Sequence, residues 1–516
     1  MGVVIRQSIK GTIMNYIGVA IGFVTTFFVM TKYLTQEEIG LTRVMADAAI
    51  LLSGLASLGT NTSALRYYPF FRDKDSHDHG FFGWTLIVPL IGFIIITILF
   101  FFFKDLIIEM FSKNSDLFVD YIYLVIPMAF FMMYMTVFET NANILMRIVV
   151  PKMVREVGVR VFTLLDYILY ITKVINLDEM VIGLCLTYLV ATLLNIIYLL
   201  KLSRIYFKIK PGYISKRLRK DFLFYTLFLT AAAVIGNIIP SLNTFFISAK
   251  LGLMITGVFT IASYMANLVE IPYRSLSAIS RPIISQAMKD GDNRRVADIC
   301  KSVSLHQLIA GAFVFFMIWI NIDLFFELLP NGDKYVEGKW VFFLLGLAKL
   351  VNSSLNIGVT VLSYSRWYYL QLIFTAILTV SAIVLNIRLI PDIGMAGAAW
   401  SSIISFSIYY LFLLSLIMWK TKISLFSWKE LVVVAIVILM FIANWLSVEY
   451  ISNTINYFND GGIVVKIIES LIRTGVLVFV GMILIYYLNV SKHVNEIIDN
   501  FFKIKMWRHL ANRLKL

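Results

Sequence analysis

The chain is a succession of apolar segments, most of them about twenty residues long, separated by short stretches of charged or turn-forming residues. A helix of about 20 apolar residues crosses the hydrocarbon core of a bilayer. The sequence therefore predicts an all-α polytopic membrane protein with about 14 transmembrane helices. The segments lie at roughly 11–31, 41–65, 83–103, 118–145, 157–172, 181–200, 221–248, 255–279, 304–325, 341–363, 369–390, 396–418, 431–450 and 467–489.

Composition supports a membrane environment. Of the 516 residues, 59% are hydrophobic and 15% are charged, whereas soluble proteins carry about 25% charged residues. Cys185 and Cys300 are far apart and form no CxxC pattern, so neither a disulfide framework nor a structural metal is expected. Arg6 and Lys10 precede the first apolar segment, which is too long for the core of a signal peptide and is interpreted as the first span rather than a cleaved leader.

The Lys and Arg residues predict the orientation, because basic loops remain on the cytoplasmic side. With the N-terminus inside, the inner segments carry 32 of the 45 basic residues and the outer loops carry 9. Both termini are therefore expected in the cytoplasm. The remaining four basic residues lie within predicted spans: Arg43, Arg274, Lys349 and Arg473.

The net charge of +14 is concentrated in juxtamembrane segments. The stretch 201–220 holds eight basic residues and no acid. A loop between two spans lies beside anionic lipid, so membrane lipids rather than nucleic acid are the expected partner. The tail 491–516 combines apolar residues near helical spacing with basic residues, which predicts an interfacial helix; a helix that docks on a partner protein is the alternative.

The loops offer no site for catalysis. None is long enough to fold alone, and the chain has no Walker A, HExxH or GxSxG motif. His77 and His79 lie in a charged turn without an evident third ligand, so no metal site is expected there. The sequence thus predicts neither catalytic residues nor a cofactor, and it places the function among the helices of a protein that is not an enzyme.

An internal repeat divides the chain. The segment Thr-Thr-Phe-Phe-Val-Met-Thr-Lys at 25–32 is followed 218 positions later by Asn-Thr-Phe-Phe-Ile-Ser-Ala-Lys at 243–250. Gly40 follows the first segment and Gly257 the second, and both segments end spans that run outward. Two six-helix halves in the same orientation are expected, with a site where they meet. The predicted parts are 1–200, a basic linker 201–220, 221–419, two appended helices in 420–490, and the tail 491–516.

Several local motifs resemble a known family. They are Ile9-Lys10-Gly11-Thr12, Thr26-Phe27-Phe28, the turn from Leu34 to Gly40 (LTQEEIG), and Ala64-Leu65-Arg66-Tyr67-Tyr68. These motifs resemble the polysaccharide-exporter branch of the MATE-like (MOP) flippases, the Wzx-type O-antigen and capsule flippases. The resemblance implies two six-helix lobes in a V, and a location in the bacterial inner membrane. It also implies export of an undecaprenyl-diphosphate oligosaccharide for surface polysaccharide, with other polysaccharide-assembly proteins as further partners.

Charged groups inside the membrane are candidates for function, because each costs at least about 2.5–3.5 kcal/mol at the bilayer centre. Arg43, Arg274 and Lys349 offer positive charge to a diphosphate or an acidic sugar. The alternative for both arginines is snorkelling, or neutralisation of the acid four residues earlier or later on the same span, which is Asp47 for Arg43 and Glu270 for Arg274. Lys349 has no acid in its own span.

The acids within the spans are candidates for coupling transport to a proton or sodium gradient. They are Asp47, Glu139, Asp166 and Glu270, with Asp166 and Glu270 the deepest. Two prolines, Pro240 and Pro272, are candidate hinges, because proline frees backbone groups within a spanning helix; a static kink is the alternative.

Alternating access of two lobes around a cationic cavity is the transport mechanism that these features favour. One alternative is a MATE-like drug or cation antiporter, which requires deep acids more than deep bases. The other is a membrane-embedded glycan polymerase or ligase. Such an enzyme usually has a sizeable loop with acidic or histidine chemistry, and this chain lacks one.

Overall fold

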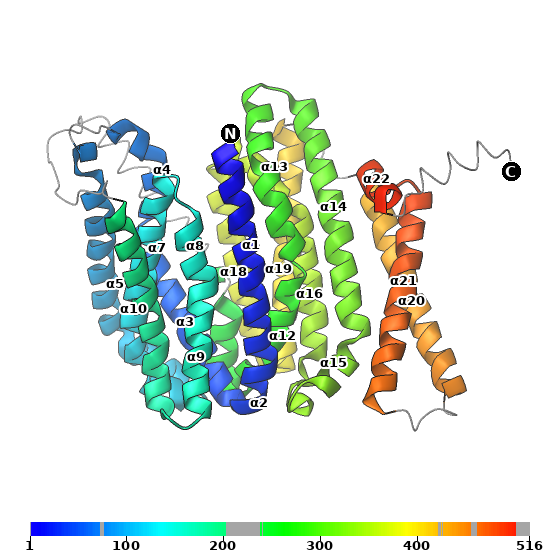
Figure 1. Ribbon diagram of the computed structural model, residues 1–516, viewed down its shortest axis with the longest axis horizontal. Helices are drawn as coiled ribbons and strands as arrows, with labels where there is room; N and C mark the ends of the chain where they lie inside the picture. The colour runs from blue at the N-terminus through cyan, green and yellow to red at the C-terminus, as the bar shows by residue number, and fades with distance from the viewer. Residues whose placement is uncertain are drawn as a thin grey trace. The chain divides into compact units, whose positions relative to one another are not determined.

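A computed structural model describes residues 2–72, 77–202, 238–239, 241–421, 425, 427–455 and 462–501. Within these residues every regular element is a helix (Figure 1). Eleven of them are long and apolar enough to cross a membrane. The predicted all-α membrane architecture is therefore confirmed, and the count of fourteen spans remains a prediction. The eleven are Ile13–Tyr33, Gln36–Ala56, Asp78–Ser112, Ile122–Ile144, Leu177–Lys201, Asn293–Ile320, Gly338–Tyr364, Leu370–Ile393, Met395–Lys420, Trp428–Val448 and Ile463–Tyr487.

Three predicted spans do not appear among the eleven. The segment 157–172 belongs to an irregular helix in which α8 (Val149–Met153) and α9 (Val159–Ile171) flank the π-helical turn η4 (Val154–Gly158). Most of 221–248 lies outside the described residues. The segment 255–279 is divided into α12 (Leu253–Leu268) and α13 (Ile271–Lys289).

This division changes the interpretation of one predicted hinge. Pro272 lies in the first turn of α13 and not inside a continuous helix. Proline is well tolerated there, because the backbone N–H that it lacks would have no partner within the helix. Pro272 is therefore compatible with the start of a new helix after the break between α12 and α13. Its role as a hinge remains a prediction. Pro240 lies outside the described residues.

The second span is shorter than predicted at its inner end. Its helix, α3 (Gln36–Ala56), begins with a capping box in which the Thr35 hydroxyl and the Glu38 carboxylate each accept a backbone N–H. It ends before Leu58 and Gly59, whose φ angles are 45° and 64°. Left-handed backbone cannot continue an α-helix. A separate helix, α4 (Thr60–Phe71), follows.

The described chain forms two compact units. Unit 1 comprises residues up to Ile261, with Leu329–Lys334 and Thr375–Ser401. Unit 2 comprises Ala262–Leu328, Tyr335–Phe374 and the residues from Ser402 onward.

Unit 1 contains the helices of the N-terminal part of the chain. Besides α3, α4, α8, η4 and α9 they are α1 (Gly2–Val24), η1 (Thr25–Met30), α2 (Thr31–Tyr33), η2 (His77–Gly80), α5 (Phe81–Ser112), α6 (Asp116–Asp120), η3 (Ile122–Leu124), α7 (Val125–Ile144) and α10 (Leu177–Lys201). The helical residues 241–251 and the start of α12 belong to this unit as well.

Unit 2 contains most of the later helices. Besides α13 they are α14 (Asn293–Ile320), α15 (Ile322–Leu328), α16 (Gly338–Leu355), α17 (Ile357–Tyr364), α20 (Trp428–Ile455), α21 (Ile463–Tyr487) and α22 (Lys492–Phe501). Like α12, the helices α18 (Leu370–Ile393) and α19 (Met395–Thr421) contribute residues to both units, and the short turn η5 (Gly332–Tyr335) crosses from unit 1 into unit 2.

The repeat segments meet within unit 1, and they do so reciprocally. A Cβ atom added to Gly40 would lie 2.0 Å from the carbonyl oxygen of Leu253. A Cβ atom added to Gly257 would lie 2.0 Å from the carbonyl oxygen of Gln36. Leu253 lies 217 positions after Gln36, and Gly257 lies 217 positions after Gly40, so the four residues are two repeat-related pairs. Each repeat therefore supplies a glycine that lets the backbone of the other approach.

A second pair of contacts in unit 1 has the same reciprocity. Asn114 donates from Nδ2 to the carbonyl oxygens of Ala249 and Lys250, at 2.9 and 3.2 Å. Asn331 donates from Nδ2 to the carbonyl oxygens of Thr31 and Lys32, at 2.9 and 3.3 Å. These bonds satisfy carbonyl groups at the ends of two repeat-related helices. The repeat predicted from two short segments thus extends to asparagines outside those segments.

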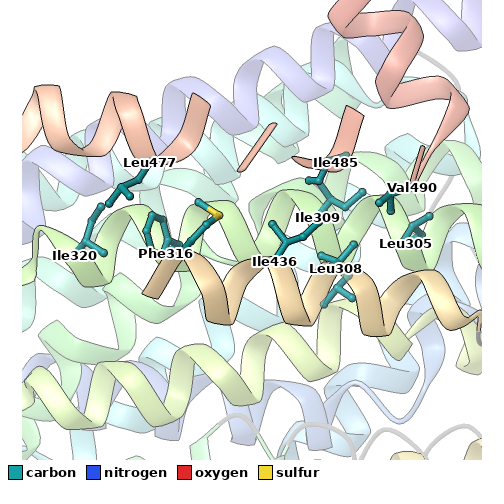
Figure 2. Packing of buried hydrophobic residues seen from close by; sticks show 11 residues of the cluster. Leu305, Leu308, Ile309, Phe316, Ile320, Ile436, Leu477, Ile485 and Val490 are labelled. Atoms are coloured by element: carbon teal, nitrogen blue, oxygen red, sulfur yellow. The ribbon is translucent and has the colours of Figure 1, made fainter. Parts of the chain in front are cut away.

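The appended helices pack within unit 2. Figure 2 shows Ile436 of α20 and Leu477 and Ile485 of α21 gathered around Phe316 and Ile309 of α14. Lipid is as apolar as these side chains, so the hydrophobic effect does not drive helices together in a membrane. Their association depends instead on close van der Waals contact. The contact fixes α20 and α21 against α14.

Candidate functional site

The predicted pair on the second span is present. Arg43 Nε lies 3.0 Å from Asp47 Oδ2 on α3, in unit 1. The Asp47 side chain is 6% exposed and that of Arg43 is 21% exposed. Asp47 therefore neutralises Arg43, as the structural alternative expects. The role of Arg43 in substrate binding remains a prediction.

The pairing expected for Glu270 is wrong. Its carboxylate is bound by two residues of α16 and not by Arg274: Lys349 Nζ lies 3.3 Å from Oε2, and Asn352 donates from Nδ2 to Oε1 at 2.9 Å. Among the described residues Arg274 makes no ion pair within 4.0 Å, and its side chain is exposed. Lys349, which has no acid in its own span, takes the acid from another helix. The two residues Glu270 and Arg274 are still one helical turn apart, because the Arg274 backbone N–H donates to the Glu270 carbonyl. The Glu270 carboxylate nevertheless takes its partners from α16 and not from its own helix.

A chain of hydrogen bonds continues from this ion pair. The Tyr410 hydroxyl donates to Asn352 Oδ1 at 2.7 Å, and Asn356 donates from Nδ2 to the Tyr410 oxygen at 3.2 Å. Tyr273 donates to Asn356 Oδ1, and Arg281 donates to the Tyr273 oxygen at 3.2 Å. All of these residues lie in unit 2, on α13, α16 and α19 or, for Glu270 and Asn356, directly at a helix end. We call Glu270, Tyr273, Arg274, Arg281, Lys349, Asn352, Asn356 and Tyr410 the polar cluster.

Most of the polar cluster is missing from the sequence prediction. Asn352 and Asn356 give the clearest sequence signal, because two amides four residues apart place polar groups on one face of an apolar helix. Tyr410 is 2% exposed and gives no such signal within its apolar span. Its hydroxyl is recognisable as part of the cluster only from its partners.

The polar cluster has more positive than negative charge. Lys349, Arg274 and Arg281 stand against one acid, Glu270, which leaves a formal charge of +2. The Arg274 backbone N–H donates to the Glu270 carbonyl at 3.3 Å, so Arg274 begins one turn from the ion pair. An anion is the complementary ligand for such a group of cations.

The remaining acids belong to unit 1 and have contrasting surroundings. Glu139 Oε2 lies 2.8 Å from Arg155 Nη1, so this acid is paired. Asp166 on α9 is 7% exposed, and its Oδ2 has no hydrogen-bond partner among the described residues. It lies against Gly183 of α10, where an added Cβ atom would be 1.9 Å from Oδ1. Asp166 is thus buried without a counter-ion among the described residues.

Arg473, the remaining basic residue within a predicted span, has partners in unit 2. Arg473 of α21 donates to the Ile320 carbonyl at 3.2 Å and lies 3.8 Å from Glu469, which ties the appended pair to α14. In the part of the chain that the structure describes, no three His, Cys, Asp or Glu side chains form a group suited to a metal ion.

The chain is similar to known proteins in both sequence and fold. The family model described as "Polysaccharide biosynthesis protein" matches residues 4–288. No protein with curated function matches by sequence.

Solved structures show the fold. The lipid II flippase MurJ in an inward closed conformation is similar with a TM-score of 0.67 and 14% identity, over 92% of this chain and 98% of that one. An inward-facing multidrug resistance MATE family transporter of the MOP superfamily gives a TM-score of 0.60 at 14% identity, over 80% and 96%. A MOP superfamily transporter from Pyrococcus furiosus gives 0.57 at 14% identity, over 80% and 94%.

Proposed function

Because this chain belongs to the polysaccharide biosynthesis protein family, whose model matches more than half of it, we propose that it is a flippase for a lipid-linked oligosaccharide. The proposed substrate is an undecaprenyl-diphosphate oligosaccharide that moves from the cytoplasmic to the periplasmic leaflet. The product would supply surface polysaccharide such as O-antigen or capsule. The fold shared with MurJ, a lipid II flippase, is consistent with such a substrate.

One observation carries the proposal within the molecule: the excess of positive charge in the polar cluster. A diphosphate is an anion that accepts several hydrogen bonds, and arginine and lysine are its usual partners. Glu270 pairs with Lys349, whereas among the described residues neither Arg274 nor Arg281 makes an ion pair within 4.0 Å. An anionic head group would therefore find cations in the cluster, and a cationic drug would be repelled.

The transport cycle that we propose is alternating access. The oligosaccharide head group enters a cationic cavity while the polyprenyl chain stays in lipid. A proton or sodium gradient is the proposed energy source, with Asp166, Asp47, Glu139 and Glu270 as candidate carriers of the coupling ion. The proposed orientation has both termini in the cytoplasm, as the distribution of basic residues predicts.

A flipping assay in proteoliposomes tests the proposal. The purified chain is reconstituted with a defined lipid-linked oligosaccharide, and translocation is followed with and without an imposed proton or sodium gradient. Translocation faster than in empty liposomes supports a flippase. Export of a cationic drug with no movement of the oligosaccharide would instead establish the antiporter alternative.

A variant experiment tests the cationic cluster. Lys349→Gln together with Arg274→Gln should abolish surface polysaccharide while the protein still inserts in the membrane. Arg388→Gln is the matched control, because Arg388 is an exposed arginine of α18 outside the cluster. Adding Glu270→Gln to the double variant removes the carboxylate that loses Lys349, and so separates loss of the cations from the cost of an unpaired acid. Normal polysaccharide in the double variant would refute a role for the cluster.

A further inference from the structure

Two basic side chains converge on one indole ring at one end of unit 2. The Arg366 guanidinium carbon lies 5.0 Å from the centroid of the Trp367 ring. The Lys420 ammonium lies 5.0 Å from the same ring and 3.5 Å from the ring of Trp419. We call Arg366, Trp367, Trp419 and Lys420 the tryptophan platform.

The platform joins two helix ends. Arg366 and Trp367 belong to the connection between α17 and α18, and Trp419 and Lys420 belong to the last turn of α19. Tyr368 and Tyr369 continue the connection and are 49% and 44% exposed. Tryptophan and tyrosine of this kind are typical of the membrane–water interface. The distribution of basic residues predicts that this interface is the cytoplasmic one.

The charges of the platform are unusual for an aromatic belt. Two cations near one ring repel each other, and an acid between them would remove the cost. Among the described residues neither Arg366 nor Lys420 makes an ion pair within 4.0 Å. The attraction of the indole faces holds the cations in place but adds no negative charge.

Another lysine–tryptophan contact in the same unit provides a comparison. Lys339 lies 5.5 Å from the Trp319 ring, so it too is placed on an indole face. That ammonium also donates to both oxygens of Asp323, at 2.6 and 2.8 Å. There the protein supplies the counter-ion itself, and at the tryptophan platform no described residue does.

We propose that the tryptophan platform binds a lipid-borne phosphate at the membrane surface. Phosphate oxygens accept charge-assisted hydrogen bonds from guanidinium and ammonium groups. The flanking aromatic rings lie at the depth of the head groups, where such a phosphate is found. The phosphate comes either from an anionic phospholipid or from the diphosphate of a lipid-linked saccharide. The proposal is independent of the flippase assignment, because either source satisfies it.

Lipid binding to the full-length chain in detergent tests the proposal. Native mass spectrometry counts the lipids bound from phosphatidylglycerol, with dioleoylglycerol as the phosphate-free control. A parallel arm uses farnesyl diphosphate, with farnesol as its control. The variant Arg366→Gln/Lys420→Gln should bind one phosphate lipid fewer, with affinity lowered at least about tenfold. Loss in the first arm identifies a phospholipid as the ligand, and loss in the second identifies the saccharide carrier.

Two variants make the experiment specific. Arg366→Lys/Lys420→Arg keeps both charges and should retain most of the binding. Lys339→Gln removes the lysine that has its own acid and should leave binding unchanged. Thermal unfolding of each variant confirms that it is folded. Wild-type affinity of Arg366→Gln/Lys420→Gln for both phosphate ligands would overturn the proposal.

Discussion

Gly40 and Gly257 make the same contact in opposite directions: a Cβ atom on either would stand 2.0 Å from a backbone carbonyl oxygen of the other repeat. No side chain fits in that space without moving a backbone segment. The seam between the repeats is therefore set by two glycines that the sequence places in corresponding turns. Because the two backbones approach so closely, even a change from glycine to alanine at either position should disturb the seam.

Gly40→Ala and Gly257→Ala should each destabilise the protein by about 1–3 kcal/mol, because the added methyl group forces the two segments apart. Thermal unfolding in detergent measures the effect. Gly475→Ala serves as the control, since a Cβ atom there meets nothing within 4 Å. Unchanged unfolding of both seam variants would contradict the close approach.

The two seam asparagines should differ in a predictable way. Asn114→Ala removes two hydrogen bonds to carbonyl groups and should cost about 1–3 kcal/mol. Asn331→Ala removes the equivalent pair and also places alanine at a φ of 54°, which is less favourable for alanine than for asparagine. The greater loss of stability should therefore occur at position 331. Equal losses, measured by denaturant unfolding, would show that the backbone conformation contributes nothing.

The Lys349–Glu270 pair should behave as a coupled unit. Lys349→Gln or Glu270→Gln alone leaves a partly buried charge without its partner and should cost about 2 kcal/mol or more. The double variant should cost at least about 1 kcal/mol less than the sum of the two, because no charge is then unpaired. A double-mutant cycle of unfolding free energies measures this coupling. Additive effects would mean that the pair makes no net interaction.

Asp166 and Asp47 should respond differently to the same substitution. Asp166→Asn breaks no ion pair among the described residues and eliminates a buried charge that has no counter-ion there, so it should leave the free energy of unfolding unchanged or higher. Asp47→Asn leaves Arg43 without its carboxylate and should cost about 1–3 kcal/mol. If Asp166 carries the coupling proton, transport by Asp166→Asn should no longer respond to an imposed pH gradient, although the variant is at least as stable as the wild type. Transport that still follows the gradient in Asp166→Asn would exclude this acid.

Contacts local in the sequence were predictable. Arg43 and Asp47 are four residues apart on one helix, and this spacing places two side chains on the same face. The two glycines of the repeat and the positions of its spans were also predictable, because short motifs and hydropathy are local properties of the sequence. Eleven predicted spans correspond to helices long and apolar enough to cross the membrane.

Contacts between distant segments were not predictable. The partner of Glu270 lies 79 positions further along the chain, and only the fold brings it near. Pro272 was interpreted from the sequence as a hinge or kink within one span, whereas one helix stops at Leu268 and the next begins at Ile271.

The reciprocal seam has the geometry of an isologous dimer interface, in which each partner offers the same patch to the other. A chain of half this length with one such glycine and one such asparagine would complete the seam only with a second copy of itself. Here both copies lie on one polypeptide, so association becomes intramolecular and no longer depends on protein concentration. The covalent link therefore frees the two halves to diverge everywhere except at the residues through which they recognise each other.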